Sequence, residues 1–191
     1  LDTLLVNKLL TQNFDQQTKQ FKESLDLNML ETQMKHTPEV QNIEVYMIPQ
    51  GALTVEVTER KPLFEVSLDK RFFGDAKGIL FDYHLNDSLN LPVFKMDSTI
   101  TSLIQTADLI SKLRNDSLLN VELEAIYLDE DEYILELRSF PFDIVIGDST
   151  QLSQKIEKLK IFCAFQISQD SLKGYKKINL SYQNQVVATK I

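Results

Sequence analysis

Apolar and polar residues alternate along two neighbouring segments in the first third of the chain. Every second residue is apolar from 43 to 47 and again from 53 to 57, namely Ile43, Val45, Met47, Leu53, Val55 and Val57. A period of two places such residues on one face of a β-strand. Pro49-Gln50-Gly51 separates the two runs, and glycine readily adopts the positive φ of a tight turn. The pattern predicts a β-hairpin with one buried face.

Two segments with helical spacing precede this hairpin. Apolar residues recur at helical intervals over residues 2–11, which predicts a first helix. Asn28 and Glu31 have the spacing of a capping box, which predicts the start of a second helix. This helix is expected to end near His36, because the residue before Pro38 is pushed out of the α region. The unit therefore reads helix, helix, strand, strand, with the helices covering the apolar face of the hairpin.

The chain from residue 64 onward is dominated by strand patterns. We predict an alternating strand at 64–68, a hairpin at 72–81 turning between Asp75 and Gly78, a short extended segment at 91–96, a hairpin over 120–138 with the acidic tip 129–132, a strand at 140–147, and two final strands at 176–182 and 185–191. Gln183-Asn184 is the expected turn between the last two.

Two helices interrupt these strands. The first follows the cap candidates Asp97-Ser98, and its predicted buried face is Ile100, Leu103, Ile104, Ala107 and Ile110. The second is predicted from about Ser149 to Phe162. The overall prediction is an α+β protein in which helices accompany antiparallel hairpins.

Composition restricts the function classes. The 191 residues are 43% hydrophobic and 25% charged, as in an ordinary folded protein, and the net charge is −8. Nucleic-acid binding needs clustered lysine and arginine, so the acidic balance argues against it and against adhesion to an anionic membrane surface. No apolar run approaches the roughly 18 to 20 residues that span a bilayer. The chain begins at Leu1, so any membrane anchor is expected upstream of it.

Candidate catalytic groups are few and scattered. His36 and His84 have no second ligand at metal-binding spacing, so surface or capping roles are predicted for them. Cys163 follows an apolar helical stripe and is predicted to be a buried small hydrophobe. The acidic tip 129–132 lacks the spacing of an EF-hand and is better explained as a solvated turn. We therefore predict no enzyme activity, no cofactor and no metal.

The end of the second alternating run marks an expected domain junction. Glu59 and Arg60 are candidates for a catalytic pair, but a solvated or interdomain salt bridge suits a strand end better. Pro62 removes a backbone donor and ends the strand or places it at an edge. We predict two domains, residues 1–63 and residues 64–191.

The last strand is the most promising interaction element. An apolar, β-branched strand that closes a sheet can present an unpaired edge and accept a strand from a partner. The alternative is that Val186 and Val187 belong to the closing strand of the core and nothing docks there. The residues alone leave both interpretations open.

Four landmarks in this order resemble the extracytoplasmic part of the FtsQ/DivIB cell-division family. They are "TPEVQNIEVYMIPQGALTVEVTERKP", which is similar to that family's POTRA signature, "FFGDAKGILF" with the later "LPVF", "DIVIGD" followed by Lys155 and Leu159, and "INLSYQNQVV". Each motif is short, and their order over nearly the whole chain makes the resemblance specific. The family pattern has Asp and Arg where this chain has Asn179 and Ser181, so the resemblance does not carry those charges over to this chain.

The resemblance implies a POTRA domain, with two helices on a small sheet, followed by a β domain. The first POTRA strand would lie upstream of Leu1. The protein would be a single-pass inner-membrane protein, with this part on the periplasmic side at the septum. It would be a non-enzymatic divisome scaffold that binds FtsB/FtsL-type partners and helps to control septal peptidoglycan synthesis. The POTRA domain would recruit other divisome proteins.

The partner site carries over onto the terminal strand. Tyr182 matches the family's tyrosine, and the resemblance extends the site over Gln183, Asn184, Gln185, Val186, Val187 and Ala188. Two alternatives remain. A POTRA-containing component of outer-membrane assembly or secretion would usually carry several POTRA repeats, and no second copy of the pattern is seen. A hydrolase would need converging titratable groups in a cleft.

Overall fold

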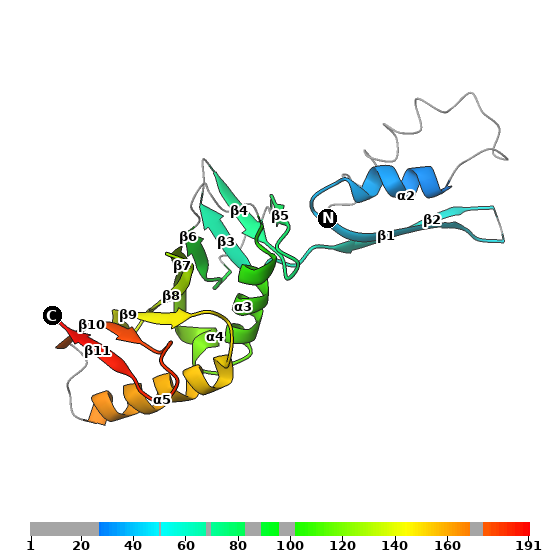
Figure 1. Cartoon of the computed structure of the whole chain (residues 1–191). Helices are drawn as coiled ribbons and strands as arrows, with labels where there is room; N and C mark the ends of the chain where they lie inside the picture. The colour runs from blue at the N-terminus through cyan, green and yellow to red at the C-terminus, as the bar shows by residue number, and fades with distance from the viewer. Residues whose placement is uncertain (1–26, 50, 68–69, 83–88, 96–101, 169–173) are drawn as a thin grey trace. The chain divides into compact units, whose positions relative to one another are not determined.

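The computed structural model describes residues 27–49, 51–67, 70–82, 89–95, 102–168 and 174–191 (Figure 1). Within these ranges the chain divides into two compact units. The small unit comprises the described residues up to Lys61 together with the short segment 80–82, and the large unit holds the rest. The helix predicted at 2–11, the caps Asp97-Ser98 and His84 lie outside the described residues.

The small unit is a helix on a two-stranded sheet. Helix α2 (Leu27–Lys35) precedes strands β1 (Val40–Met47) and β2 (Leu53–Glu59), and Figure 1 shows the helix running along the hairpin. The strands are antiparallel, with Ile43 opposite Val57 and Val45 opposite Val55. The predicted hairpin is therefore confirmed.

The hairpin turn also agrees with the prediction. Gly51 has a φ of +78°, and its N–H donates to the carbonyl of Ile48 at 2.8 Å. The buried core of this unit consists of Met34, Val40, Ile43 and Val45, with Leu27, Leu53, Val55 and Val57 packed against it. Met47 is the exception to the predicted apolar face, because it lies at the turn end of β1 and is 47% exposed.

The predicted capping box is wrong. Asn28 lies inside α2, where its carbonyl accepts a hydrogen bond from the Thr32 hydroxyl at 2.7 Å. The Glu31 carboxylate accepts the N–H of Val45 at 2.9 Å, across from the helix to β1. A tertiary hydrogen bond thus uses the side chain that the local spacing assigned to the start of the helix. His36 lies just past the C-terminal end of α2, with Nδ1 2.6 Å from the Thr32 carbonyl oxygen.

A nine-stranded mixed sheet has the order β11-β10-β9-β8-β7-β6-β3-β4-β5, and all of its strands except β5 belong to the large unit. Its strands are β3 (Phe64–Ser67), β4 (Arg71–Gly74), β5 (Leu80–Phe81), β6 (Val93–Lys95), β7 (Leu123–Asp129), β8 (Glu132–Leu137), β9 (Phe140–Gly147), β10 (Tyr175–Asn179) and β11 (Val187–Lys190). Strand β6 pairs in parallel with both β3 and β7, and β10 pairs in parallel with β9. The predicted α+β class is confirmed.

One row of side chains crosses the sheet and forms the centre of its core. The row passes between paired residues of successive strands through Val66, Phe94, Ile126, Leu135, Ile144 and Ile178. All of these side chains are 0% exposed. Burial of each large apolar side chain contributes about 1.5–3 kcal/mol. The row continues onto β11 as the small, half-buried Ala188, so the core thins at this edge.

Helices α3 (Ile104–Arg114), α4 (Leu119–Glu122) and α5 (Leu152–Ser168) accompany the sheet. Three sequence predictions about them need correction. Ile104 begins α3 and is 64% exposed, whereas Leu109 and Leu113 are buried in its place. Residues 120–122 belong to α4 rather than to a strand. Helix α5 begins three residues later than predicted and continues past Phe162, because its last turns still contribute the buried Cys163 and Gln166.

Candidate functional site: the terminal edge of the sheet

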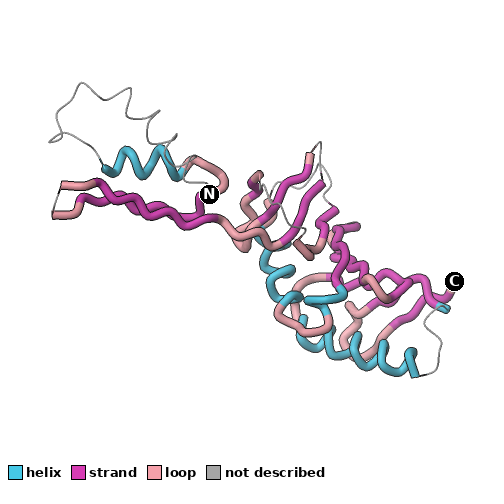
Figure 2. The backbone as a smooth tube through the Cα atoms, turned by 180° about the vertical axis from the view of Figure 1, so that it is seen from behind, coloured by secondary structure: helices cyan, strands magenta, loops and turns pink. Residues whose placement is uncertain are grey.

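The final two strands form one end of the large sheet. Strand β10 pairs in parallel with β9 on one side and antiparallel with β11 on the other. Strand β11 is last in the sheet order, so one of its edges has no partner strand within the described residues. Figure 2 shows these strands beside the C-terminus, with α5 running alongside them. An unpaired edge presents backbone N–H and C=O groups that can accept another strand.

The segment between β10 and β11 leaves the core at Leu180. This side chain is fully buried, and its N–H donates to the Val145 carbonyl at 2.9 Å. The following residues Ser181 to Gln185 are exposed, with the turn at Gln183-Asn184 as predicted. The chain thus changes from core to surface within two residues.

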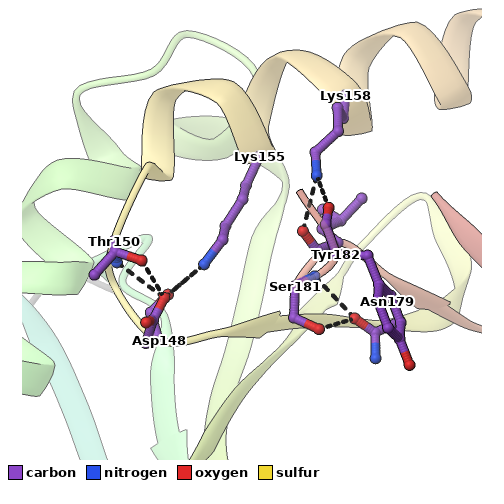
Figure 3. Close-up of polar contacts among 8 residues, drawn as sticks. Asp148, Thr150, Lys155, Lys158, Asn179, Ser181 and Tyr182 are labelled. Atoms are coloured by element: carbon purple, nitrogen blue, oxygen red, sulfur yellow. Dashed lines mark hydrogen bonds and ion pairs between the residues drawn. The ribbon is translucent and has the colours of Figure 1, made fainter. Parts of the chain in front are cut away.

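Asn179 and Ser181, which replace charged residues of the family pattern, bond to each other. The Asn179 Oδ1 atom accepts the Ser181 N–H at 2.8 Å and the Ser181 hydroxyl at 2.7 Å (Figure 3). This is the local turn that asparagine side chains favour. In this chain the two positions therefore end β10 and set the direction of the segment that follows.

Lys158 of α5 connects the helix to the same segment. Its ammonium donates to the Leu180 carbonyl at 3.0 Å and to the Tyr182 carbonyl at 2.6 Å (Figure 3). Hydrogen bonds from a charged donor are stronger than those between neutral groups. The path of the terminal segment is thus held from the side of the helix as well as by the sheet.

A second lysine of α5, Lys155, bonds to the loop that precedes the helix. Its ammonium is buried and donates to the Asp148 carboxylate at 2.7 Å and to the Asp148 carbonyl at 2.9 Å. The hydrogen bond from Lys155, supported by one from the Thr150 hydroxyl, lowers the pKa of Asp148 to about 2. Lys155 is the lysine that the sequence resemblance singled out. In the structure it fixes the loop between β9 and α5.

The predicted partner-binding residues lie together along this terminal segment. Tyr182 is 49% exposed and Val187 is 39% exposed. Gln183, Asn184 and Gln185 are exposed, and Val186 and Ala188 are half-buried. These degrees of exposure are compatible with docking. Their role in binding stays a prediction.

The predicted junction residues differ from one another in their surroundings. Glu59 is exposed and Pro62 is half-buried. Arg60 is buried, and its guanidinium donates to the carbonyls of Pro38 at 2.7 Å and Val40 at 2.9 Å. Arg60 is therefore not solvated, because these bonds hold its guanidinium inside the small unit between the end of β2 and the start of β1. The alternative, an interdomain salt bridge between Glu59 and Arg60, stays a prediction.

Possible metal-binding groups and the single cysteine were the other candidates that the sequence offered. No group of three or more His, Cys, Asp or Glu side chains there could hold a metal ion. Cys163 is buried as predicted, and burial raises the pKa of its thiol to about 11. In the same part of the chain no helix has the length and apolarity needed to cross a membrane.

Sequence reasoning missed Lys158 and its two carbonyl partners. The available signal was weak: a lysine on the flank of an amphipathic helix usually points into solvent. The contact depends on the parallel placement of β10 beside β9, which brings residues 180–182 next to α5. Only the tertiary arrangement reveals that this lysine belongs to the terminal edge.

The described residues form a mixed sheet that ends in the strand edge of β11. A family model described as "FtsQ/DivIB, C-terminal related" matches residues 61–189. The chain therefore belongs to the FtsQ/DivIB C-terminal related family, as the sequence motifs indicated. Proteins of this kind are generally non-enzymatic, membrane-anchored division proteins, so membership indicates a role in cell division. No curated protein matches the chain in the comparison made.

Proposed function

We propose that this chain is the extracytoplasmic part of a divisome scaffold and that it binds FtsB/FtsL-type partners by strand addition at β11. The observation that carries the proposal is the edge of β11 at the end of the sheet, which pairs with no other strand among the described residues, in a chain of this family. Main-chain pairing would supply affinity and alternate side chains specificity. Through these partners the protein would help to control septal peptidoglycan synthesis.

The two units suit separate tasks within this proposal. Residues 1–63 would form a POTRA domain that recruits other divisome proteins, and residues 64–191 would form the partner-binding β domain. The helix-on-hairpin core of the small unit supports the first assignment. The protein would be anchored in the inner membrane by an upstream segment, with both domains on the periplasmic side at the division site.

Isothermal titration with the extracytoplasmic segments of the FtsB–FtsL pair from the same genome tests this function. The proposal predicts saturable binding by the wild-type chain. An absence of heat and of any complex by gel filtration at the same concentrations would contradict it.

Proline substitutions at adjacent positions of β11 test the mode of binding. Successive N–H groups of a strand point to opposite edges. Of Val187→Pro and Ala188→Pro, one therefore removes a donor from the pairing with β10, and the other removes a donor from the free edge. We expect the variant with the smaller loss of melting temperature to lose partner binding. Undiminished binding by that variant would place the partner elsewhere.

Tyr182→Ala tests the side-chain part of the site. Because Tyr182 is about half exposed, we expect weaker partner binding with little change in melting temperature. Tyr46→Ala, which removes a 40% exposed tyrosine of β1 outside the proposed segment, is the matched control and should bind nearly as wild type. A parallel loss of stability and binding in Tyr182→Ala would make Tyr182 a core residue and contradict the assignment.

A further inference from the structure

Lys158 is placed where the chain passes from the buried end of β10 to the exposed edge. Its two carbonyl partners belong to Leu180, which is fully buried, and Tyr182, which is half exposed. A lysine ammonium has three donors, and two of them are directed at this segment. The helix that carries Lys158 is anchored in the core through Ile156 and Leu159 on either side of it. A rigid element therefore holds the segment by its backbone.

The segment held in this way leads to β11, which pairs with β10 but buries little of its surface. Strand β11 has only four residues, and its burial pattern is exposed, half-buried, exposed, exposed. Short and exposed elements open locally at low free-energy cost. A partner strand can pair only with the fraction of molecules in which β11 is formed, and the apparent affinity falls by that fraction. A contact that keeps this segment ordered therefore acts on binding without touching the partner.

We propose that Lys158 is a positioning residue: by donating hydrogen bonds to the carbonyls of Leu180 and Tyr182, it keeps the docking edge ordered before the partner binds. This inference rests on the proposed function for its consequence in binding. Its structural content, the ordering of residues 181–190 by Lys158, is independent of any partner.

The chain offers matched variants for the test. Lys158→Met keeps the length and apolar stem of the side chain but removes the donors. Lys158→Arg keeps a charged group that can donate to both carbonyls and should restore the clasp. Lys160→Met removes a second lysine of α5, which pairs with the Asp116 carboxylate at 2.5 Å and does not bond to the terminal segment.

Hydrogen–deuterium exchange of the free protein is the first measurement. In Lys158→Met, amides of residues 181–190 should exchange about tenfold faster, which is the order expected when a charge-assisted hydrogen bond is lost. Amides of β7 and β8 should keep their wild-type rates. Lys158→Arg should return to wild-type exchange, and Lys160→Met should leave the terminal segment unchanged.

Surface-immobilised binding kinetics with the same FtsB–FtsL segments is the second measurement. Loss of preorganisation should lower the association rate of Lys158→Met by about tenfold and change the dissociation rate less. Three outcomes would overturn the positioning role. Two concern Lys158→Met, namely unchanged exchange at 181–190 or faster exchange across the whole sheet. The third is an effect of Lys160→Met on exchange at 181–190 equal to that of Lys158→Met. Faster exchange with wild-type association would overturn its part in docking. Failure of the wild-type chain to bind would instead count against the proposed function, while the exchange data would still decide whether Lys158 orders the edge.

Discussion

The two units of this protein stabilise sheets in different ways. The small unit has a two-stranded sheet, a core of a few apolar residues, and the buried guanidinium of Arg60 bonded to the carbonyls of Pro38, just before β1, and Val40, at the start of β1. The large unit contains eight strands of a nine-stranded sheet, crossed by a continuous row of fully buried apolar side chains. A two-stranded hairpin is marginal by itself and needs additional packing. Hydrogen bonds from side chains to the backbone therefore contribute a larger share of the stability in the small unit than in the large unit.

The same difference separates the interior of the large sheet from its terminal edge. At β11 the apolar row ends in Ala188, and the polar contacts of Lys158 and Asn179 organise the chain. Where apolar burial is limited, specific hydrogen bonds determine the conformation. The substitutions below test this contrast between apolar and polar stabilisation.

Phe94→Ala should have the largest effect. The side chain is 0% exposed and lies in the central row of the large sheet, so we expect a loss of about 3–5 kcal/mol in the unfolding free energy of the large unit. The buried Cys163, the sole cysteine, reports on this unit, and its labelling by a thiol reagent in urea should occur at lower denaturant concentration.

Ile43→Ala is the matched control in the small core, where Ile43 is 1% exposed. It should lower the stability of the small unit while leaving the denaturant dependence of Cys163 labelling unchanged. Equal shifts of Cys163 labelling in both variants would show that the two units unfold together, and the comparison between them would fail.

Arg60→Met should destabilise the small unit by about 2–3 kcal/mol, because the carbonyls of Pro38 and Val40 lose a charged donor in a buried position. Exchange of β1 and β2 amides measures the effect. Lys35→Met, which removes only the exposed pair with Glu31, is expected to cost less than about 1 kcal/mol. Comparable losses in the two variants would mean that Arg60 contributes no more than a surface residue.

Substitutions in the turns of two hairpins should change stability in opposite directions. Glu130 and Asp131 have φ values of 48° and 66° at the tip between β7 and β8. Replacing them with Asn-Gly should stabilise the large unit by about 1 kcal/mol, since this dipeptide favours positive φ at both positions. Gly51→Ala should destabilise the small unit by about 1 kcal/mol, because alanine is strained at the φ of +78°. Thermal melts of both variants check the signs.

Asp148 should give the smallest effect, and only in acid. The pKa of Asp148, about 2, lies below the ordinary aspartate value near 3.9. Between about pH 2 and pH 4 the folded state therefore binds fewer protons than the unfolded state. The contribution of Asp148 to stability is therefore present above about pH 4 and is lost as the pH falls towards 2. Urea melts across this range should show a shallower decline for Asp148→Asn. Thr150→Val, which removes the second donor, should be intermediate, and identical pH profiles for all three chains would refute the pairing.

The sequence motifs predicted the family that the match over residues 61–189 supports, and periodicity predicted most of the strands. These predictions from local sequence were wrong where a tertiary contact competed with a local rule. Glu31 bonds to Val45 of β1 instead of closing a capping box. The strand assigned from Asn120 begins only at Leu123, because residues 119–122 form α4 and bury Leu119. The apolar spacing also placed Ile104 in the core, although the helix begins there and the side chain faces solvent.

The sequence by itself determined the β1–β2 hairpin, the turn at Gln183-Asn184 and the burial of Cys163, because alternation, turn chemistry and helical spacing act between near neighbours. Only the tertiary structure decided that β6 lies between β3 and β7, that β11 ends the sheet, and that Lys158 bonds to the segment leading to β11. These features join residues far apart in the chain. They follow from which strands pair and which helix packs beside them, and no local pattern encodes that choice.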